Sequence, residues 1–329
     1  MTFGGMTSII RSSTLWFAGA AMFAVPAMAA FITGDVFVGA GNGQVFVYDQ
    51  SGNLLQKLSS GLSSETTGMA FDASGNLYST NFGAQQIVKY DVNGTKIGTF
   101  GSGFNADPES IVFDKSGNAY VGQADGTHSI LKFDSSGNLL KTLTPTQTDR
   151  GTDWIDLSAD QSTIYFAGEG ATIRTINTST GLLGPNFTTL GSQQFALRLL
   201  SDGGILVADG SNVLRYDSTG HIIKTYTGFT GTSELFALNL DPDGTSFWTG
   251  DIGGSTKVFK VDIATGNILT SWAASKDGAS EVAGLAVFGE ITQGGPPTNG
   301  VPEPSAVVLT AGGLLLLAFR FRAAKFGRA

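Results

Sequence analysis

Short apolar runs separated by polar turns fill the middle of the chain. Within these runs hydrophobic residues recur at short intervals, as in Val36 and Val38, and again in Ile87, Val88 and Tyr90. Runs of roughly four to six residues with turn signals about every 8 to 12 residues are typical of antiparallel strands. Helical periodicity is absent from this part of the sequence. The pattern therefore predicts an all-β fold.

One turn sequence recurs along the chain. It first reads YDQSGN, starting at Tyr48, and its Asp, Ser, Asn and Gly residues are strong turn formers. Related turns start 40 to 45 residues apart, at Tyr90, Phe133, Ile176, Tyr216 and Val261. A second series lies between them, at Phe71, Phe113, Leu157, Leu200 and Leu240. Four strands in about 42 residues are typical of one blade of a β-propeller.

The two ends of the repeat region complete each other. Full repeats start near Gly68, Ser110, Trp154, Ala196 and Ala237. The region opens at Gly34 with three strands, and it closes with GLAVFGE at 284–290, which matches the first strand of a repeat. Pairing of 284–290 with the opening strands closes the ring without a free edge. We therefore predict a six-bladed β-propeller over 34–290.

The repeat text resembles the NHL and gluconolactonase-like propellers, most clearly in GGILVADGSNVLRYDSTGHII at 203–223. The resemblance spans 34–290 and implies the propeller fold. It also implies a possible hydrolase site, in which a Glu, an Asp and Asn side chains surround a divalent ion. Glu65 or Glu281 would take the place of the Glu, and Asp153 or Asp209 that of the Asp. The entering loops carry Asp, Gln or Glu where those enzymes have Asn, which departs from the pattern.

The first 29 residues read as a secretory signal peptide. Arg11 supplies the positive charge, the apolar stretch runs from Leu15 to Val25, and Ala27 and Ala29 form a small-x-small cleavage site. The sequence contains no cysteine, so an exported fold cannot depend on disulfides. Core burial and backbone hydrogen bonds must stabilise it.

A second processing segment lies at the other end. A Gly/Pro-rich linker at 291–300 precedes Pro302, Glu303 and Pro304, and these precede an apolar run at 305–319 that is followed by four cationic residues. This order, within 301–329, resembles the PEP-CTERM sorting signal of Gram-negative bacteria. The resemblance implies cleavage by an exosortase and delivery to the cell surface or an exopolysaccharide matrix. The run is shorter than the roughly 20 residues of a stable span, so we expect a transient inner-membrane anchor, a transmembrane helix that is later removed.

The net charge of the chain limits the classes of partner that it can bind. The chain has 19 basic and 27 acidic residues. Without Arg11, Glu303 and the four cationic residues of the tail, 14 basic and 26 acidic residues remain. This balance argues against nucleic acid and anionic lipid as partners. It favours cations, or a polymer bridged through cations.

Acidic residues recur in the loops that enter each blade and in the loops between second and third strands. Both sets of loops are expected at one mouth of the central channel. Oxygen ligands suit hard cations, so we predict Ca²⁺ or Mg²⁺ binding by the entering-loop acids Glu65, Asp153, Glu234 and Glu281. Further ligand-binding candidates are Asp107, Glu109, Asp125, Glu169, Gln194, Asp209 and Asp251. For Asp209 and Asp251 the alternative is a capping role in their own turns. Phe82 and Phe104, expected in loops, are candidates for stacking on sugar rings.

Catalytic motifs are scarce. The two histidines, His128 and His221, form no recognisable constellation, and no nucleophile elbow, zinc-binding helix or phosphate loop occurs in the sequence. We therefore expect a non-catalytic binding or matrix protein, whose partner is a polysaccharide or a surface protein. Signal peptidase and exosortase would process it. The alternative is a metal-dependent hydrolase of lactonase or esterase type, with its site at the acidic mouth.

Overall fold

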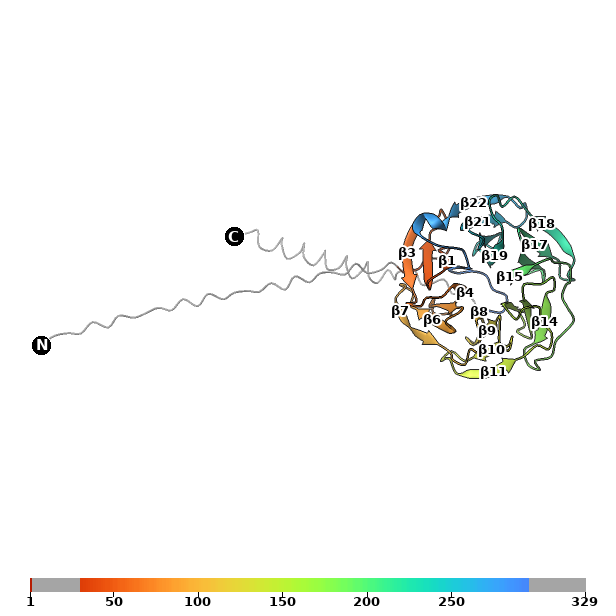
Figure 1. The fold of residues 1–329 in the computed structure, drawn as a ribbon, viewed down its shortest axis with the longest axis horizontal. Helices are drawn as coiled ribbons and strands as arrows, with labels where there is room; N and C mark the ends of the chain where they lie inside the picture. Colours follow the sequence, from red (N-terminus) through yellow and green to blue (C-terminus); the bar gives the residue numbers. More distant parts are fainter. Residues whose placement is uncertain (2–29, 296–329) are drawn as a thin grey trace, which may run out of the picture.

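A computed structural model describes residue 1 and residues 30–295 of the chain. The predicted signal cleavage at Ala27 and Ala29, the Pro302–Pro304 motif and the apolar run at 305–319 lie outside the described residues. Within the described residues no helix is long and apolar enough to cross a membrane. Six small sheets are arranged around a central axis (Figure 1). The predicted six-bladed β-propeller is confirmed.

Each blade is a meander that runs from the channel outward. Blade 1 consists of β23 (Gly284–Val287), β1 (Val36–Ala40), β2 (Gln44–Tyr48) and β3 (Leu54–Ser59). Blade 2 consists of β4 (Thr66–Phe71), β5 (Leu77–Asn81), β6 (Gln86–Tyr90) and β7 (Lys96–Phe100). Blade 3 consists of β8 (Pro108–Phe113), β9 (Ala119–Gln123), β10 (Ile130–Phe133) and β11 (Leu139–Leu143).

The other three blades complete the ring. Their strands are β12 (Trp154–Leu157), β13 (Thr163–Ala167), β14 (Arg174–Asn177), β15 (Gln194–Leu199), β16 (Ile205–Asp209), β17 (Asn212–Tyr216), β18 (Ile222–Tyr226), β19 (Leu235–Leu240), β20 (Ser246–Asp251), β21 (Lys257–Asp262) and β22 (Ile268–Ala273). A short 3-10 turn, η1 (Ala274–Asp277), follows the last of them.

The ring closes as the sequence predicted, with a shorter strand. β23 pairs antiparallel with β1, in a register that sets Val36 opposite Val287 and Val38 opposite Leu285. The strand ends at Val287 instead of continuing to residue 290. Gly289 adopts a φ of 84°, which turns the chain out of the ladder, and the backbone of Glu290 donates to the Val287 carbonyl.

Blade 4 departs from the four-strand expectation. Its sheet has three strands, and its outer position is taken by 182–188, which make only two isolated bridges, Ile176 to Leu183 and Ile173 to Thr188. Pro185 lies between these bridges. Because proline has no backbone N–H, it cannot donate to a ladder. Its carbonyl instead accepts a hydrogen bond from the Thr175 hydroxyl at 2.8 Å.

The recurrent turns cap themselves. In the first, one carboxylate oxygen of Asp49 accepts the backbone N–H groups of Ser51 and Asn53, and the other accepts the Asn53 amide. The same pattern recurs at Asp72, Asp114 and Asp134. These acids are therefore consumed by the fold. All such turns lie at one end of the channel, which we name the lower face.

The loops that enter the blades and the loops between second and third strands lie together at the opposite end, the upper face. Backbone hydrogen bonds join them: Phe82 donates to Glu65, Ala124 to Asp107, and Arg150 to Gly168. The two acid-bearing loop series predicted from the sequence therefore share one face. Between the faces, the side chains of Trp154 and Trp248 are buried in the core.

Residues 288–295, which we name the strap, lie across the lower mouth of the channel. A side chain at Gly294 would clash with the Leu157 side chain and carbonyl, so the strap lies close against β12. Glu290 is buried, which raises its pKa to about 7 against the opposing effect of the Arg198 charge on an inner strand. The described chain also begins on this face, since the Phe31 backbone donates to Val92 in a lower turn. Both of its ends thus lie opposite the upper mouth.

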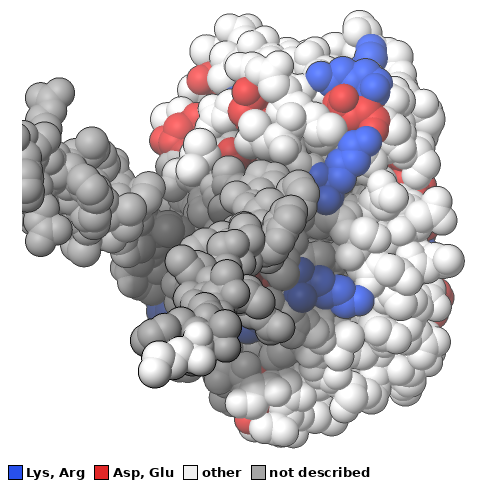
Figure 2. Space-filling model, turned by 90° about the vertical axis from the view of Figure 1, so that its left-hand side faces the viewer, with Lys and Arg blue, Asp and Glu red and all other residues white. Residues whose placement is uncertain are grey.

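The side wall carries little charge. Figure 2 shows acidic and basic side chains scattered over a largely uncharged surface on one side of the ring. This agrees with a charged fraction of only 14%.

Neighbouring inner strands touch through glycine, which gives a test of the ring. A Cβ at Gly284 would overlap the backbone carbonyl of Thr67 on the next blade. We expect Gly284→Ala to lower the free energy of unfolding by about 1–3 kcal/mol, because the backbones must separate. Thermal and urea unfolding would measure it.

Gly83 is the matched control. A Cβ there meets nothing closer than 3.8 Å, so Gly83→Ala should leave the melting temperature almost unchanged. Equal melting temperatures for the two variants would show that the inner strands are not packed as described.

Candidate functional site: the acidic upper mouth

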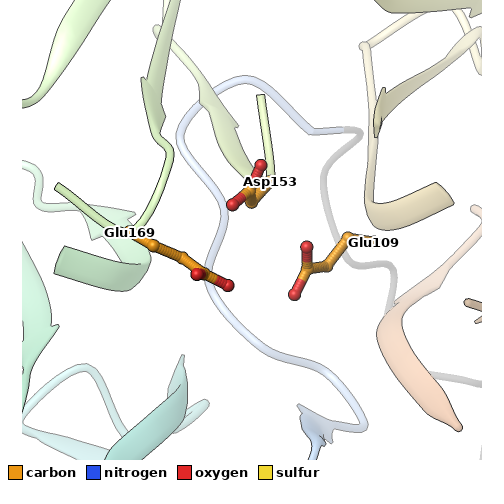
Figure 3. Close-up of side chains that lie close together, drawn as sticks. All are labelled: Glu109, Asp153 and Glu169. Carbon is orange, nitrogen blue, oxygen red and sulfur yellow. The ribbon is translucent and has the colours of Figure 1, made fainter. Parts of the chain in front are cut away.

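Three carboxylates from two neighbouring blades converge at the upper mouth. Glu109 is the second residue of β8, Asp153 directly precedes β12, and Glu169 follows β13. One oxygen from each lies within 4.8 Å of the others. Figure 3 shows the three side chains pointing toward a common space. We name this set the acidic trio.

Two members of the trio are buried without partners. Glu109 is 1% exposed and Asp153 is 0% exposed. One oxygen of Glu109 and both oxygens of Asp153 accept no hydrogen bond from the described residues. Burial of an unpaired charge is costly, so such groups take up protons or bind cations.

The pKa values follow from this burial. Burial, and next the charge of Glu169, raises the pKa of Asp153 from 3.8 to about 8. Burial and then the charges of Asp153 and Glu169 raise the pKa of Glu109 well above 4.5. At neutral pH the metal-free trio therefore retains protons that a bound cation would displace.

Arg150 is a cation set among the acids of this mouth. Its guanidinium forms ion pairs with Asp125 at 3.0 Å and with Glu169 at 2.6 Å. Its Cζ lies 5.4 Å from the centre of the Phe82 ring. The hydrogen bonds from Arg150 hold the pKa of Asp125 below its ordinary value. Arg150 thus fixes Glu169 in place and leaves Glu109 and Asp153 unpaired.

The backbone at this mouth is strained. Asp107 and Glu169 adopt φ values of 46° and 63°, a region that side chains other than glycine rarely occupy. Such conformations cost on the order of 1–3 kcal/mol each and are concentrated at functional sites. The surrounding hydrogen bonds must therefore hold these acids in a conformation that the local sequence does not favour.

Glu65 and Glu281 lie in a separate cleft on the upper face, between blades 1 and 2. This cleft has a volume of about 440 Å³, and Phe82, Asn42, Ser63 and Ser64 also line it. Burial and then the charge of Glu65 raise the pKa of Glu281. The four acids predicted to bind metal therefore do not meet at one site. Asp153 belongs to the trio, while Glu65 and Glu281 form a pair in this cleft.

Glu234 and Gln194 lie near the mouth in other blades. Burial and then the charges of Glu169 and Asp251 raise the pKa of Glu234, which places it near the trio but not in it. Gln194 is buried at the start of β15, where its amide donates to the Tyr216 hydroxyl at 2.7 Å. Its side-chain oxygen has no partner among the described residues.

Asp209 and Asp251 act as caps. Asp209 accepts hydrogen bonds from the Ser192 backbone and hydroxyl and from the Gln193 backbone. Asp251 accepts four backbone N–H groups and the Ser255 hydroxyl. Asp251 caps its own turn, as the capping alternative predicted, and also the entering loop. Asp209 instead caps the entering loop at Ser192 and Gln193 and makes no such bond in its own turn. We leave both out of the site.

The remaining candidates lie apart. Phe104 packs on Phe133 with ring centres 5.5 Å apart and lines another cleft of about 370 Å³ on the outer side of blade 2. His128 lies 3.0 Å from the Ala124 carbonyl through Nδ1, and His221 is an exposed turn residue. Within residues 30–295 neither histidine joins a metal-ligating group.

Sequence reasoning missed Arg150 and the grouping of the trio. Arg150 gives a weak signal, a lone arginine in an acid-rich mouth between Asp149 and Asp153. The trio combines one acid predicted to bind metal with two predicted only as general ligand-binding residues. Their convergence depends on how far each inner strand reaches into the channel, which spacing in the sequence does not reveal.

Comparisons support the fold alone. No protein-family model matches the chain, and no curated protein matches it. A chain in a nidogen–laminin complex aligns with a TM-score of 0.66 and 14% identity, covering 78% of this chain and 98% of that one. The WD40 propeller domain of Doa1 aligns with a TM-score of 0.59 and 14% identity, covering 82% and 88%. A protein of unknown function from Bacteroides caccae gives 0.61 and 14%, covering 76% and 97%. The body is a β-propeller.

The raised pKa of Asp153 predicts how stability depends on pH. The folded pKa, about 8, exceeds the ordinary value of 3.8, so the folded protein holds the proton more tightly than the unfolded chain. This contribution is complete below pH 3.8 and is lost as the pH rises to about 8. In EDTA we expect Asp153→Asn to reduce the fall in unfolding free energy over this window, by up to about 1.4 kcal/mol per pH unit.

Urea unfolding at pH 4, 6 and 8 measures this slope. Asp134→Asn is the control, because Asp134 lies in an exposed turn where hydrogen bonds from Asn138 lower its pKa. It should leave the slope above pH 4 unchanged. An unchanged slope in Asp153→Asn as well would contradict the burial described for this carboxylate.

Proposed function

We propose that this chain is an exported, non-catalytic binding protein of the cell surface or exopolysaccharide matrix, which engages its ligand at the upper mouth through a divalent cation. The observation that carries the proposal is the acidic trio, whose buried oxygens on Glu109 and Asp153 lack partners. Carboxylate oxygens without nitrogen or sulfur ligands suit Ca²⁺ or Mg²⁺.

The residues divide the work between holding the ion and shaping its surroundings. Glu109, Asp153 and Glu169 would supply three of the six to eight oxygens that Ca²⁺ takes, leaving positions for water and for ligand oxygens. Arg150 orients Glu169 through the 2.6 Å ion pair. A cation held in this way would offer its open positions to the hydroxyl or carboxylate oxygens of a polysaccharide.

The position of the chain ends supports a surface role. The described chain begins and ends on the lower face, and the strap covers the lower mouth. A tail that anchors the protein would therefore leave from the side opposite the trio. The upper mouth would face away from the membrane, toward the matrix.

Calcium titration tests the cation. We expect Ca²⁺ to raise the melting temperature, with about 2.7 kcal/mol of added stability at a concentration 100-fold above Kd. Affinity should increase from pH 6 to 8, because Glu109 and Asp153 must lose protons. Calorimetry on the wild type and on Glu109→Gln with Asp153→Asn would measure both effects.

The matched control is Glu290→Gln, which alters a buried acid at the opposite end of the channel. It should bind Ca²⁺ as the wild type does, whereas the trio variant should not. Absence of heat and of any melting shift at millimolar Ca²⁺ or Mg²⁺ would end the cation proposal. Metal-dependent turnover of lactones or esters that the trio variant loses would replace it with the hydrolase alternative.

Processing is tested separately. In a Gram-negative host with an exosortase, we expect the secreted protein to begin at Ala30 and to end at or near Pro302–Pro304. Intact-mass spectrometry of the culture supernatant would measure both ends. Replacing Pro302, Glu303 and Pro304 with alanine should leave the tail on and retain the protein in the membrane fraction. Secretion of a full-length tail would contradict the sorting role.

A further inference from the structure

The cleft between blades 1 and 2 carries features that the acidic trio does not explain. Its walls come from four loops of the upper face, which bring Glu65 and Glu281 together with the Phe82 ring. Within residues 30–295, neither carboxylate forms an ion pair with Lys or Arg. Glu65 and Glu281 repel each other, because the charge of Glu65 contributes to the raised pKa of Glu281 after burial. Two neighbouring carboxylates without a counter-ion favour a cationic ligand.

We propose that this cleft binds the protonated amine of an amino sugar, presented by a polysaccharide that is at least partly de-N-acetylated. The proposal rests on the proposed function, because it names the polymer that the upper face would engage. The primary ammonium group has three N–H donors, which match the carboxylates of Glu65 and Glu281 and one further oxygen.

The cleft suits an organic cation better than a bare metal ion. Ca²⁺ takes six to eight oxygens at 2.3–2.6 Å, and within the described residues only the trio brings three acidic groups together. A cleft of about 440 Å³ is within the usual range for a small-molecule site, and it is far larger than an ion. The Phe82 ring supplies no oxygen ligand for a metal ion.

The other lining residues favour a sugar over a simple alkyl amine. Ser63, Ser64 and Asn42 place hydroxyl and amide groups around the cleft, where ring hydroxyls can bond. Phe82 provides an apolar surface for the C–H face of a pyranose ring. Arg150 packs on this ring at 5.4 Å, which fixes the position of the wall. Arg150 also pairs with Glu169, so this contact connects one wall of the cleft to the trio.

Three probes of graded chemistry test the proposal on the secreted protein: a glucosamine trimer, its fully N-acetylated counterpart and ethylamine. Calorimetry in EDTA should show the glucosamine trimer binding at least about tenfold more tightly than either of the others. The reason is that N-acetylation removes the charge, and ethylamine lacks the ring and hydroxyls. Equal affinity for the N-acetylated trimer would overturn the amine, and equal affinity for ethylamine would overturn the sugar.

Variants separate this cleft from the trio. Glu281→Gln should weaken trimer binding at least about tenfold, the loss expected for one charge-assisted hydrogen bond. Glu65→Gln, at an exposed residue with little risk to folding, should act in the same direction. Glu290→Gln, at a buried acid at the opposite end of the channel, should bind the trimer as the wild type does. Two outcomes would overturn the assignment of the amine to this cleft. One is loss of trimer affinity only in the trio variant. The other is competition between Ca²⁺ and the trimer that Glu281→Gln abolishes.

The two proposals fail independently. The trimer is measured in EDTA, so its binding does not depend on a cation at the trio. If Ca²⁺ fails to bind but the trimer binds, the cleft stands and the cation is withdrawn. If the trimer fails while Ca²⁺ binds, the inference about the amino sugar is withdrawn and the cation remains.

Discussion

Closure of the ring by β23 and β1 is the constraint on which the rest of the structure depends. The four residue pairs of this ladder join segments that are nearly 250 positions apart in sequence. Once they pair, six inner strands must converge on one axis, and their backbones approach so closely that Gly284 cannot carry a side chain. The same convergence forces Glu109 and Asp153 from different blades into one mouth. The buried charge at the upper face is therefore a consequence of closure.

Asp49 on the lower face and Asp153 on the upper face show two opposite uses of an aspartate. On the lower face, carboxylates such as Asp49 accept the hydrogen bonds of their own turn, and hydrogen bonds from Asn53 lower the pKa of Asp49. On the upper face, burial raises the pKa of Asp153 because no donor compensates it. The same residue type is thus structural where donors reach it, as at Asp49 and at Asp251 on the upper face, and available for a ligand where none do. The difference arises from the number of backbone N–H groups within reach.

The strap makes the two ends of the channel different, because it covers only the lower mouth. Its Gly294 lies against Leu157, and Glu290 is buried. With the lower mouth covered and the described ends of the chain on that side, the proposed ligands would have access from the upper face. The cation at the trio and the amine at the Glu65–Glu281 cleft would then be two adjacent contacts for one polymer. Phe82 and Arg150 lie between them.

The sequence by itself determined the propeller, the blade count and the closing segment, because turn chemistry and strand alternation are local properties that repeat every 40 to 45 residues. It also placed the acid-bearing loops on one face, since strand order in a meander fixes which turns lie together. Only the tertiary structure decided which acids meet. Asp153 joined Glu109 and Glu169, while Glu65 paired with Glu281, and Asp209 was taken up as a cap. Side-chain reach, loop conformation and the ion pairs of Arg150 set these groupings. They depend on distances of a few ångströms between blades that no local pattern encodes.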